Sequence, residues 1–141
     1  MKIVKCITKD QLIDHYTIRK IVFIDEQNVS YEDEFDLLEK SRIPFVLYDN
    51  DKPIGAARLN TQNNYTKIER MCILSEYRAK GLGKLIMNYL IDYSNNLGVQ
   101  EVLLSAQVQA LGFYESLGFT KFGDEFLDAN IPHYKMKKNL L

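Results

Sequence analysis

The sequence predicts an α/β (α+β) fold in which a mixed, mostly antiparallel sheet carries helices on both faces. The main observation is the order of the segments: a strand, a helical repeat, three strand-like runs separated by turns, a second helical repeat, and then strand, helix and final strands. The second observation is size and composition, because 141 residues with 46% hydrophobic and 26% charged side chains suffice for one core. We therefore expect a single domain over residues 1–141.

The amino-terminal segment predicts a strand followed by a long helix. Residues 2–7 are typical of a short strand, and Thr8 with the glutamine three positions later has the spacing of a capping box. Apolar residues then recur every three or four positions, so the helix should extend to about Gln27, with His15 on its exposed surface. The acidic segment 32–39 follows, and we interpret it as a solvated loop or frayed helix rather than as part of a substrate site.

The remaining elements are predicted by turn residues and helical spacing. Runs of β-branched and aromatic residues at 44–48, 54–59 and 65–74 are separated by turn-rich segments, which is typical of an antiparallel meander. Apolar residues at steps of three and four predict a helix over 82–97, with Gly98 as its left-handed cap. The last expected elements are a strand at 102–105, a helix at 107–117 ended by Gly118, and strands at 120–126 and 133–138.

Charge and cysteine content argue against several classes of protein. Lys and Arg number 18 against 19 for Asp and Glu, a formal net charge of -1, so a nucleic-acid partner is not expected. The first residues lack the continuous apolar run of a signal peptide or membrane span, so we expect a cytoplasmic location without a membrane partner. Cys6 and Cys72 should be reduced thiols, and with His15 and His133 they lack the spacing of zinc ligands, so no metal is expected.

The most informative local motif is the turn from Arg78 to Lys84, between the meander and the second long helix. It combines two glycines with three cations. Backbone amides and the dipole at a helix start favour a phosphate group, and glycine removes the Cβ that would block its approach. A P-loop would need Gly in place of Arg78 and Ser or Thr in place of Leu85, and a dinucleotide fingerprint would need Gly in place of Ile86. Both motifs are excluded, and because a pair of glycines also permits a tight turn from strand to helix, the turn alone does not define a ligand.

Two motifs together resemble the GNAT superfamily of acyl-CoA-dependent N-acetyltransferases. The turn fits Q/R-x-x-G-x-G/A, the pyrophosphate loop of that family, and residues 110–119 fit A-x-x-F-Y-x-x-x-G-F, a pattern of its later helix. Segments 22–27, 105–107 and 131–133, with Met136, resemble the small ElaA-like bacterial group in particular. The expected element order agrees with the family through essentially the whole chain.

The resemblance implies that acetyl-CoA lies in a V-shaped opening between the strand ending near Leu74 and the strand ending near Ser105. The pantetheine arm would pair with backbone groups of the first strand, and the glycine turn would bind the pyrophosphate mainly through amides. Gln107 stands where many family members have Asn. The residues that would bind the cofactor are Met71, Cys72, Ile73, Arg78, Ala79, Lys80, Gly81, Leu82, Gly83, Lys84, Gln107 and Tyr114.

For the reaction, the resemblance implies direct attack of a neutral primary amine on the thioester, without a covalent enzyme intermediate. Backbone amides near Ile73 would stabilise the developing oxyanion. Tyr114 is the expected general acid for the departing thiolate, because a phenol with a pKa of about 10 can donate to a thiolate whose acid has a pKa of about 8.5 when a hydrogen bond assists the transfer.

The general base is open among Glu69, Glu26 and His133. Glu69 alternates with Arg70 along the predicted strand, so at most one of the two should face the substrate. Cys72 lies in an apolar strand without an adjacent base, so we expect a buried, unreactive thiol rather than a nucleophile.

The sequence thus predicts an N-acetyltransferase that uses acetyl-CoA and acts on an amine of a small molecule or peptide. The alternative is a non-catalytic acyl-CoA-binding or sensing module, and a third hypothesis is transfer of a longer acyl group. Acidic residues at 26 and 32–36 would suit a cationic amine. A homodimer is common among similar proteins, although no stretch of the sequence identifies an interface.

Overall fold

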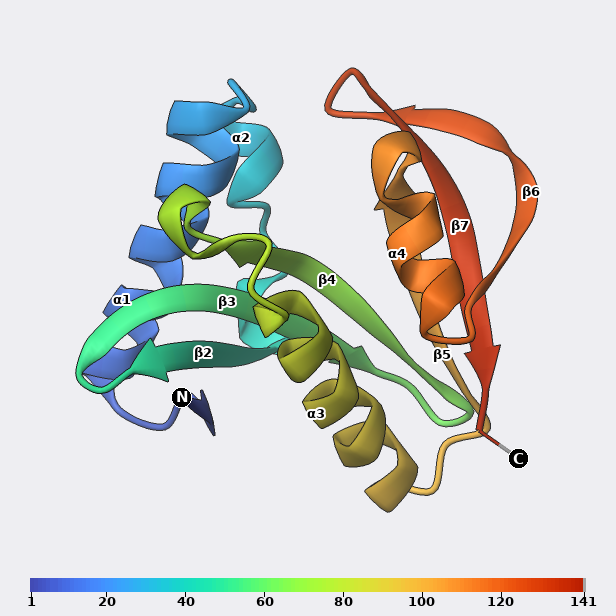
Figure 1. Cartoon of the computed structure of the whole chain (residues 1–141), viewed down its shortest axis with the longest axis horizontal. Helices are drawn as coiled ribbons and strands as arrows, with labels where there is room; N and C mark the ends of the chain where they lie inside the picture. The colour runs from blue at the N-terminus through green and yellow to red at the C-terminus, as the bar shows by residue number, and fades with distance from the viewer. Residues whose placement is uncertain (141) are drawn as a thin grey trace.

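A computed structural model of the protein describes residues 1–140, which form a seven-stranded sheet in the order β1-β2-β3-β4-β5-β7-β6 (Figure 1). The strands are β1 (Lys2–Lys5), β2 (Ile43–Asp49), β3 (Lys52–Thr61), β4 (Tyr65–Ile73), β5 (Glu101–Gln107), β6 (Thr120–Asp128) and β7 (Ile131–Asn139). The helices are α1 (Lys9–Arg19), the π-helix η1 (Lys20–Glu26), α2 (Tyr31–Glu34), α3 (Leu82–Asn96), α4 (Leu111–Ser116) and the 3-10 turns η2 (Glu39–Ser41), η3 (Ser75–Tyr77) and η4 (Val108–Ala110). Within residues 1–140 every strand pair is antiparallel except β4–β5, which confirms the predicted fold class.

The local signals at the helix ends act as expected. The hydroxyl of Thr8 accepts a hydrogen bond from the Gln11 amide at 3.2 Å, and the Gln11 side chain accepts one from the Thr8 amide at 3.1 Å, which completes the capping box. The first helix runs from α1 into η1 and ends at Glu26, beside the predicted Gln27. Gly98 follows α3 with a φ of 80°, as a left-handed cap requires.

Helices cover both faces of the sheet. Phe45 on β2 packs its ring edge against Tyr89 and Tyr93 of α3. Tyr48, three positions further, points to the other face and donates a hydrogen bond to Asp14 of α1 at 2.5 Å. In Figure 1, α3 accordingly lies in front of the sheet and α1 behind it.

The sheet opens between its two central strands. β4 and β5 pair in parallel from Tyr65↔Glu101 to Ile68↔Leu104, and beyond this point they diverge (Figure 1). Between β3 and β4, Ala56 pairs with Cys72, and the next pair is Arg58 with Glu69. One residue of β3 therefore lies opposite two residues of β4, which is a β-bulge in β4. This bulge coincides with a left-handed backbone at Arg70, whose φ is 56°.

Three expectations about the fold need correction. His15 is fully buried rather than on the helix surface, because its Nδ1 hydrogen-bonds the Phe45 carbonyl at 3.0 Å. The acidic segment is not simply solvated, because Glu34 on α2 is only 2% exposed and pairs with Arg19. The helix predicted over 107–117 is shorter, because β5 continues to Gln107 and a 3-10 turn precedes α4.

No helix within residues 1–140 combines the length and apolar character needed to cross a membrane.

Candidate active site

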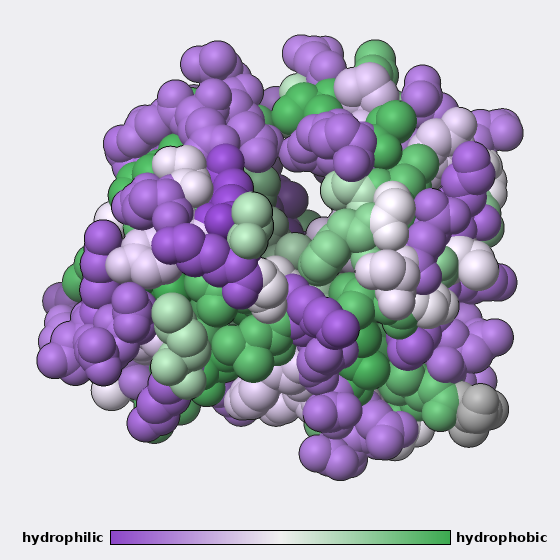
Figure 2. Space-filling model, viewed as in Figure 1, coloured by the Kyte–Doolittle hydropathy of each residue, from purple (hydrophilic) through white to green (hydrophobic). Residues whose placement is uncertain are grey.

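The opening between β4 and β5 is a cleft with a volume of about 790 Å³. Its walls come from η1 and α2 on one side, from β4 and the start of α3, and from β5, α4 and the β6–β7 turn on the other side. Figure 2 shows the cleft as a hollow near the middle of this face, with hydrophilic residues along one side and hydrophobic residues along the other. A volume of this size is in the usual range of small-molecule and cofactor sites.

The cleft brings together most of the residues that the sequence analysis singled out. Those that line it are Glu69, Met71, Cys72, Ile73, Arg78, Ala79, Gly81, Leu82, Gly83, Lys84, Gln107, Tyr114 and His133. Lys80 and Glu26 are not among the lining residues; Lys80 lies over the ring of Tyr77, and Glu26 pairs with Arg78. One group of side chains around a single cavity is what the resemblance led us to expect.

The two glycines of the turn have different roles. Gly81 caps the amino-terminal end of α3 with a φ of 78°, and a Cβ there would meet no atom within 4 Å. This position therefore combines a left-handed backbone with open space for an anion in front of the helix amides. A Cβ on Gly83 would lie 3.3 Å from the Phe113 ring, so the second glycine allows α4 to approach α3 closely.

Arg78 is held by the protein itself rather than standing free. Its Nε donates to the Ile73 carbonyl at 2.9 Å, and both terminal nitrogens donate to the Glu26 carboxylate. The hydrogen bond from Arg78 lowers the pKa of Glu26, and the same pair raises the pKa of Arg78. The positive charge of Arg78 is thus already balanced, which leaves Lys80 and Lys84 as the remaining cations of the turn.

Tyr114 lies on α4 with its ring edge against Phe113 and Phe119. Burial raises the pKa of Tyr114 to about 12, with a smaller contribution from Cys72, so the phenol is protonated at neutral pH. Within residues 1–140 its hydroxyl makes no hydrogen bond, and the side chain lines the cleft. Burial also raises the pKa of the Cys72 thiol, which agrees with an unreactive thiol.

The three candidate bases have different surroundings. His133 on β7 is 8% exposed, stacks on Phe126, and has its Nδ1 2.6 Å from the Ile131 carbonyl. Glu69 accepts hydrogen bonds on Oε1 from two arginines, Arg42 and Arg58, each at 2.9 Å. His133 and Glu69 line the cleft, whereas Glu26 does not.

The expected alternation of Glu69 and Arg70 is wrong. Both side chains line the cleft and both lie on the α1 face, where Arg70 contacts Asp36 at 3.4 Å and Glu69 contacts Arg58. The cause is the β4 bulge, since an extra residue in a left-handed conformation cancels the reversal between neighbours. No pattern of residue types in this segment indicates the bulge.

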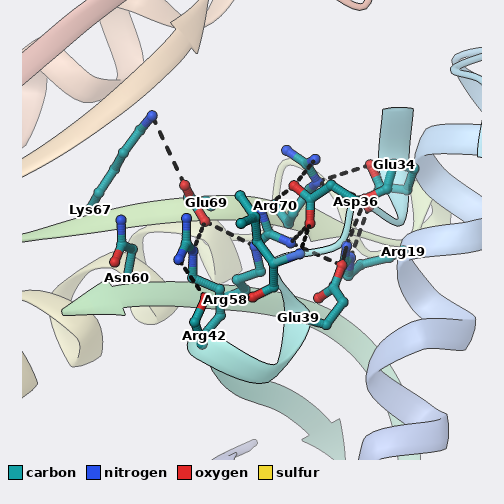
Figure 3. A network of polar contacts seen from close by, with 12 residues as sticks. Arg19, Glu34, Asp36, Glu39, Arg42, Arg58, Asn60, Lys67, Glu69 and Arg70 are labelled. Carbon is teal, nitrogen blue, oxygen red and sulfur yellow. Dashed lines mark hydrogen bonds and ion pairs between the residues drawn. The ribbon is translucent and has the colours of Figure 1, made fainter. Parts of the chain in front are cut away.

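A network of ion pairs, which the sequence analysis missed, lies on the α1 face of the cleft (Figure 3), and four of its residues, Glu34, Lys67, Glu69 and Arg70, line the cleft. The ion-pair network consists of Arg19, Glu34, Asp36, Glu39, Arg42, Arg58, Lys67, Glu69 and Arg70. Arg58, with a side chain only 2% exposed, is its centre and contacts Asp36, Glu39 and Glu69. Bonds from Arg58 hold the pKa of Asp36 down at about 2.

Gln27 also lies at the site, although sequence reasoning did not assign it there. Its Oε1 accepts a hydrogen bond from Gln107 Nε2 at 3.0 Å, which joins the end of η1 to the end of β5 across 80 residues. The side chains of Gln27 and Gln107 both line the cleft. The only signal for Gln27 was its place in segment 22–27, which resembles the ElaA-like group.

Comparison with known proteins identifies the class. Residues 13–140 match the acetyltransferase (GNAT) domain family, so the chain belongs to the GNAT family of acetyltransferases. The uncharacterized N-acetyltransferase YjcF of Bacillus subtilis is 41% identical over 140 residues, which cover 99% of this chain and 100% of YjcF.

Solved structures agree with this assignment. A Lactobacillus plantarum protein described as an N-acetyltransferase superposes with a TM-score of 0.92 at 26% identity, covering 99% of this chain and 98% of that one. Escherichia coli ElaA has the same fold, with a TM-score of 0.82, 22% identity and 97% of each chain covered. An Elizabethkingia anophelis GNAT acetyltransferase that contains acetyl-CoA has a TM-score of 0.77 at 13% identity, covering 99% of this chain and 97% of that one.

Proposed function

We propose that this GNAT protein transfers an acetyl group from acetyl-CoA directly to a primary amine of a small molecule or peptide. The observation that carries the proposal is that Tyr114 and most residues of the glycine turn line the same cleft. A module that only bound or sensed acyl-CoA would need the turn but would have no use for a protonated phenol there. The acetyl-CoA in the Elizabethkingia anophelis structure supports the choice of donor.

In this proposal the amides at the start of α3 bind the diphosphate, and Lys80 and Lys84 add charge. Diverging strands expose backbone groups of Met71, Cys72 and Ile73 for the pantetheine arm. The amine attacks the thioester carbonyl, a C–N bond forms, and the C–S bond breaks. Tyr114 then donates its proton to the departing thiolate.

His133 is the base that the hydrogen bonds favour. A carbonyl oxygen only accepts, so the contact with Ile131 places the ring proton on Nδ1 and leaves Nε2 free to take a proton from the ammonium group, directly or through water. Glu69 is less suited, since one of its oxygens already accepts from two arginines. Glu26 is less suited as well, because Arg78 occupies its carboxylate.

The test is release of CoA from acetyl-CoA with a panel of amines, followed by mass detection of the acetylated product. Tyr114→Phe should lower kcat by about 100-fold or more with the affinity for CoA unchanged. Tyr89→Phe, on α3 and not among the residues that line the cleft, is the matched control and should leave both unchanged. Binding of CoA without turnover of any amine, equal in wild type and Tyr114→Phe, would instead establish a binding module. Acetyl-, succinyl- and longer acyl-CoA compared as donors define the acyl group.

A further inference from the structure

Two cationic side chains at the closed end of the cleft, Lys67 and Arg70, have hydrogen-bond donors that are available to a ligand. Lys67 and Arg70 line the cleft on either side of Glu69, and Figure 3 shows all three on the same side of β4. The nearest acidic atom to Lys67 Nζ is Glu69 Oε2 at 4.0 Å, and the Lys67 side chain is 37% exposed. Arg70 donates hydrogen bonds from Nε to the Glu34 carbonyl and from Nη2 to the Asp33 carbonyl and the Asp36 carboxylate. Its Nη1 makes no hydrogen bond within residues 1–140.

The carboxylates of this wall are already neutralised. The ion-pair network holds five cations and four carboxylates, counted as Arg19, Arg42, Arg58, Lys67 and Arg70 against Glu34, Asp36, Glu39 and Glu69. The network therefore carries one net positive charge. It does not form an acidic wall that would select a cationic amine. Two exposed carboxylates of the cleft, Asp33 and Asp128, make no ion pair within the described residues and remain available to an ammonium group.

We propose that the amine acceptor also carries a carboxylate, and that Lys67 and Arg70 bind this carboxylate. The inference rests on the proposed function and names its substrate class: a small zwitterionic molecule such as an amino acid. Lysine and arginine donors form charge-assisted hydrogen bonds to carboxylates, and the free Nη1 and Nζ supply them. The carboxylates at Asp33 and Asp128 complement the ammonium end of the same molecule.

The position of the two cations fits this role. The glycine turn lies at the open end of the cleft, and the β4–β5 pairing that stops at Ile68↔Leu104 closes the other end. A cofactor whose diphosphate binds at the turn directs its thioester toward the closed end, where Lys67 and Arg70 lie. A carboxylate held there places the neighbouring amine beside the thioester, which is the positioning that direct transfer needs.

The experiment compares free amino acids with their carboxamides as acceptors, with acetyl-CoA as donor. The acids should have kcat/KM values at least tenfold higher, and Lys67→Gln should remove this preference by raising KM for the acids only. Lys2→Gln, an exposed lysine of β1, makes the same charge change away from the cleft and should keep the preference. An unchanged acid-to-amide ratio in Lys67→Gln, or a preference for carboxamides or for the diamine putrescine in wild type, overturns the inference while leaving amine acetylation intact.

If wild type acetylates no amine, the proposed function itself fails. Calorimetric titration of the complex with CoA then still tests the inference, using the same pairs of acids and carboxamides. Binding of the acids at least tenfold tighter than the carboxamides, lost in Lys67→Gln, supports a carboxylate site. Equal binding, or none, overturns it.

Discussion

The two walls of the cleft differ in composition, because one consists mainly of backbone groups and the other of charged side chains. The wall assigned to the cofactor consists of one continuous turn, from Arg78 to Lys84, and the backbone of one strand. The wall on the α1 face consists of side chains whose partners mostly lie far away in the sequence, such as Asp36, which is 22 residues from Arg58 and 34 residues from Arg70. The first wall should therefore tolerate changes of side chain and fail when its backbone is blocked, whereas the second should fail when one charge is removed.

The sharpest difference should appear in stability when Arg58 is replaced. Arg58→Met leaves Asp36, Glu39 and Glu69 without their shared partner, and loss of one member of a buried ion pair costs about 3–5 kcal/mol. Urea unfolding should show this loss in the free energy of unfolding. Lys20→Met is the control, because its exposed pair with Asp25 is worth about 0–1 kcal/mol. Equal losses in the two variants would mean that the ion-pair network does not stabilise the fold.

Acid should destabilise the protein through His15, which contacts Arg19 of the ion-pair network. Burial lowers the pKa of His15 to about 4, whereas an unfolded histidine titrates near 6.5. The unfolded chain takes up this proton first, so the stabilisation is complete above about pH 6.5 and is lost as the pH falls toward 4, by about 3 kcal/mol at the most. The stabilisation from the Asp36 carboxylate is lost only at lower pH, between about 4 and 2, because its pKa is lowered to about 2 in the folded protein.

The measurement is the free energy of unfolding between pH 7.5 and 4 for wild type and His15→Gln. Glutamine can still donate to the Phe45 carbonyl and accept from Arg19, but it does not titrate. Its curve should be flatter between pH 6.5 and 4. Parallel curves would show that His15 is not the group that takes up the proton.

The wall assigned to the cofactor should respond in binding rather than in stability. Gly81→Asp places a negative charge and a side chain in front of the α3 amides, so the affinity for CoA should fall at least tenfold. Gly81→Ala imposes the same left-handed strain without the charge and separates the two effects. Titration calorimetry with CoA measures both variants, and an unchanged affinity in Gly81→Asp would remove the turn from the phosphate site.

This difference also explains what the sequence could and could not predict. The capping box at Thr8, the left-handed cap at Gly98 and the element order follow from local patterns, and the structure has them where they were expected. The glycine turn belongs to this class because the phosphate site proposed there depends on the backbone of seven consecutive residues. A short motif therefore sufficed to place most of that wall.

The wall on the α1 face depends on pairings that no short segment contains. Glu34 is buried in ion pairs with Arg19 and Arg70, and the buried His15 hydrogen-bonds the Phe45 carbonyl. The bulge that turns Glu69 and Arg70 to one side arises from the register between β3 and β4. Polar residues are interpreted as exposed when their partners are unknown, so these groups were placed wrongly or missed.

The smallest effect is expected from the ion pair between Glu26 and Arg78, which joins η1 to the glycine turn. Glu26→Gln should free the Arg78 guanidinium to contact the diphosphate, raising the affinity for CoA about two- to threefold at low salt and less at high salt. The pair is partly exposed, so the free energy of unfolding should change by less than about 1 kcal/mol. Glu32→Gln is the control, since it removes one exposed negative charge on α2 without freeing an arginine. A fall in affinity in Glu26→Gln alone would mean that Glu26 holds Arg78 in its binding position, so that this wall, too, depends on a distant side chain.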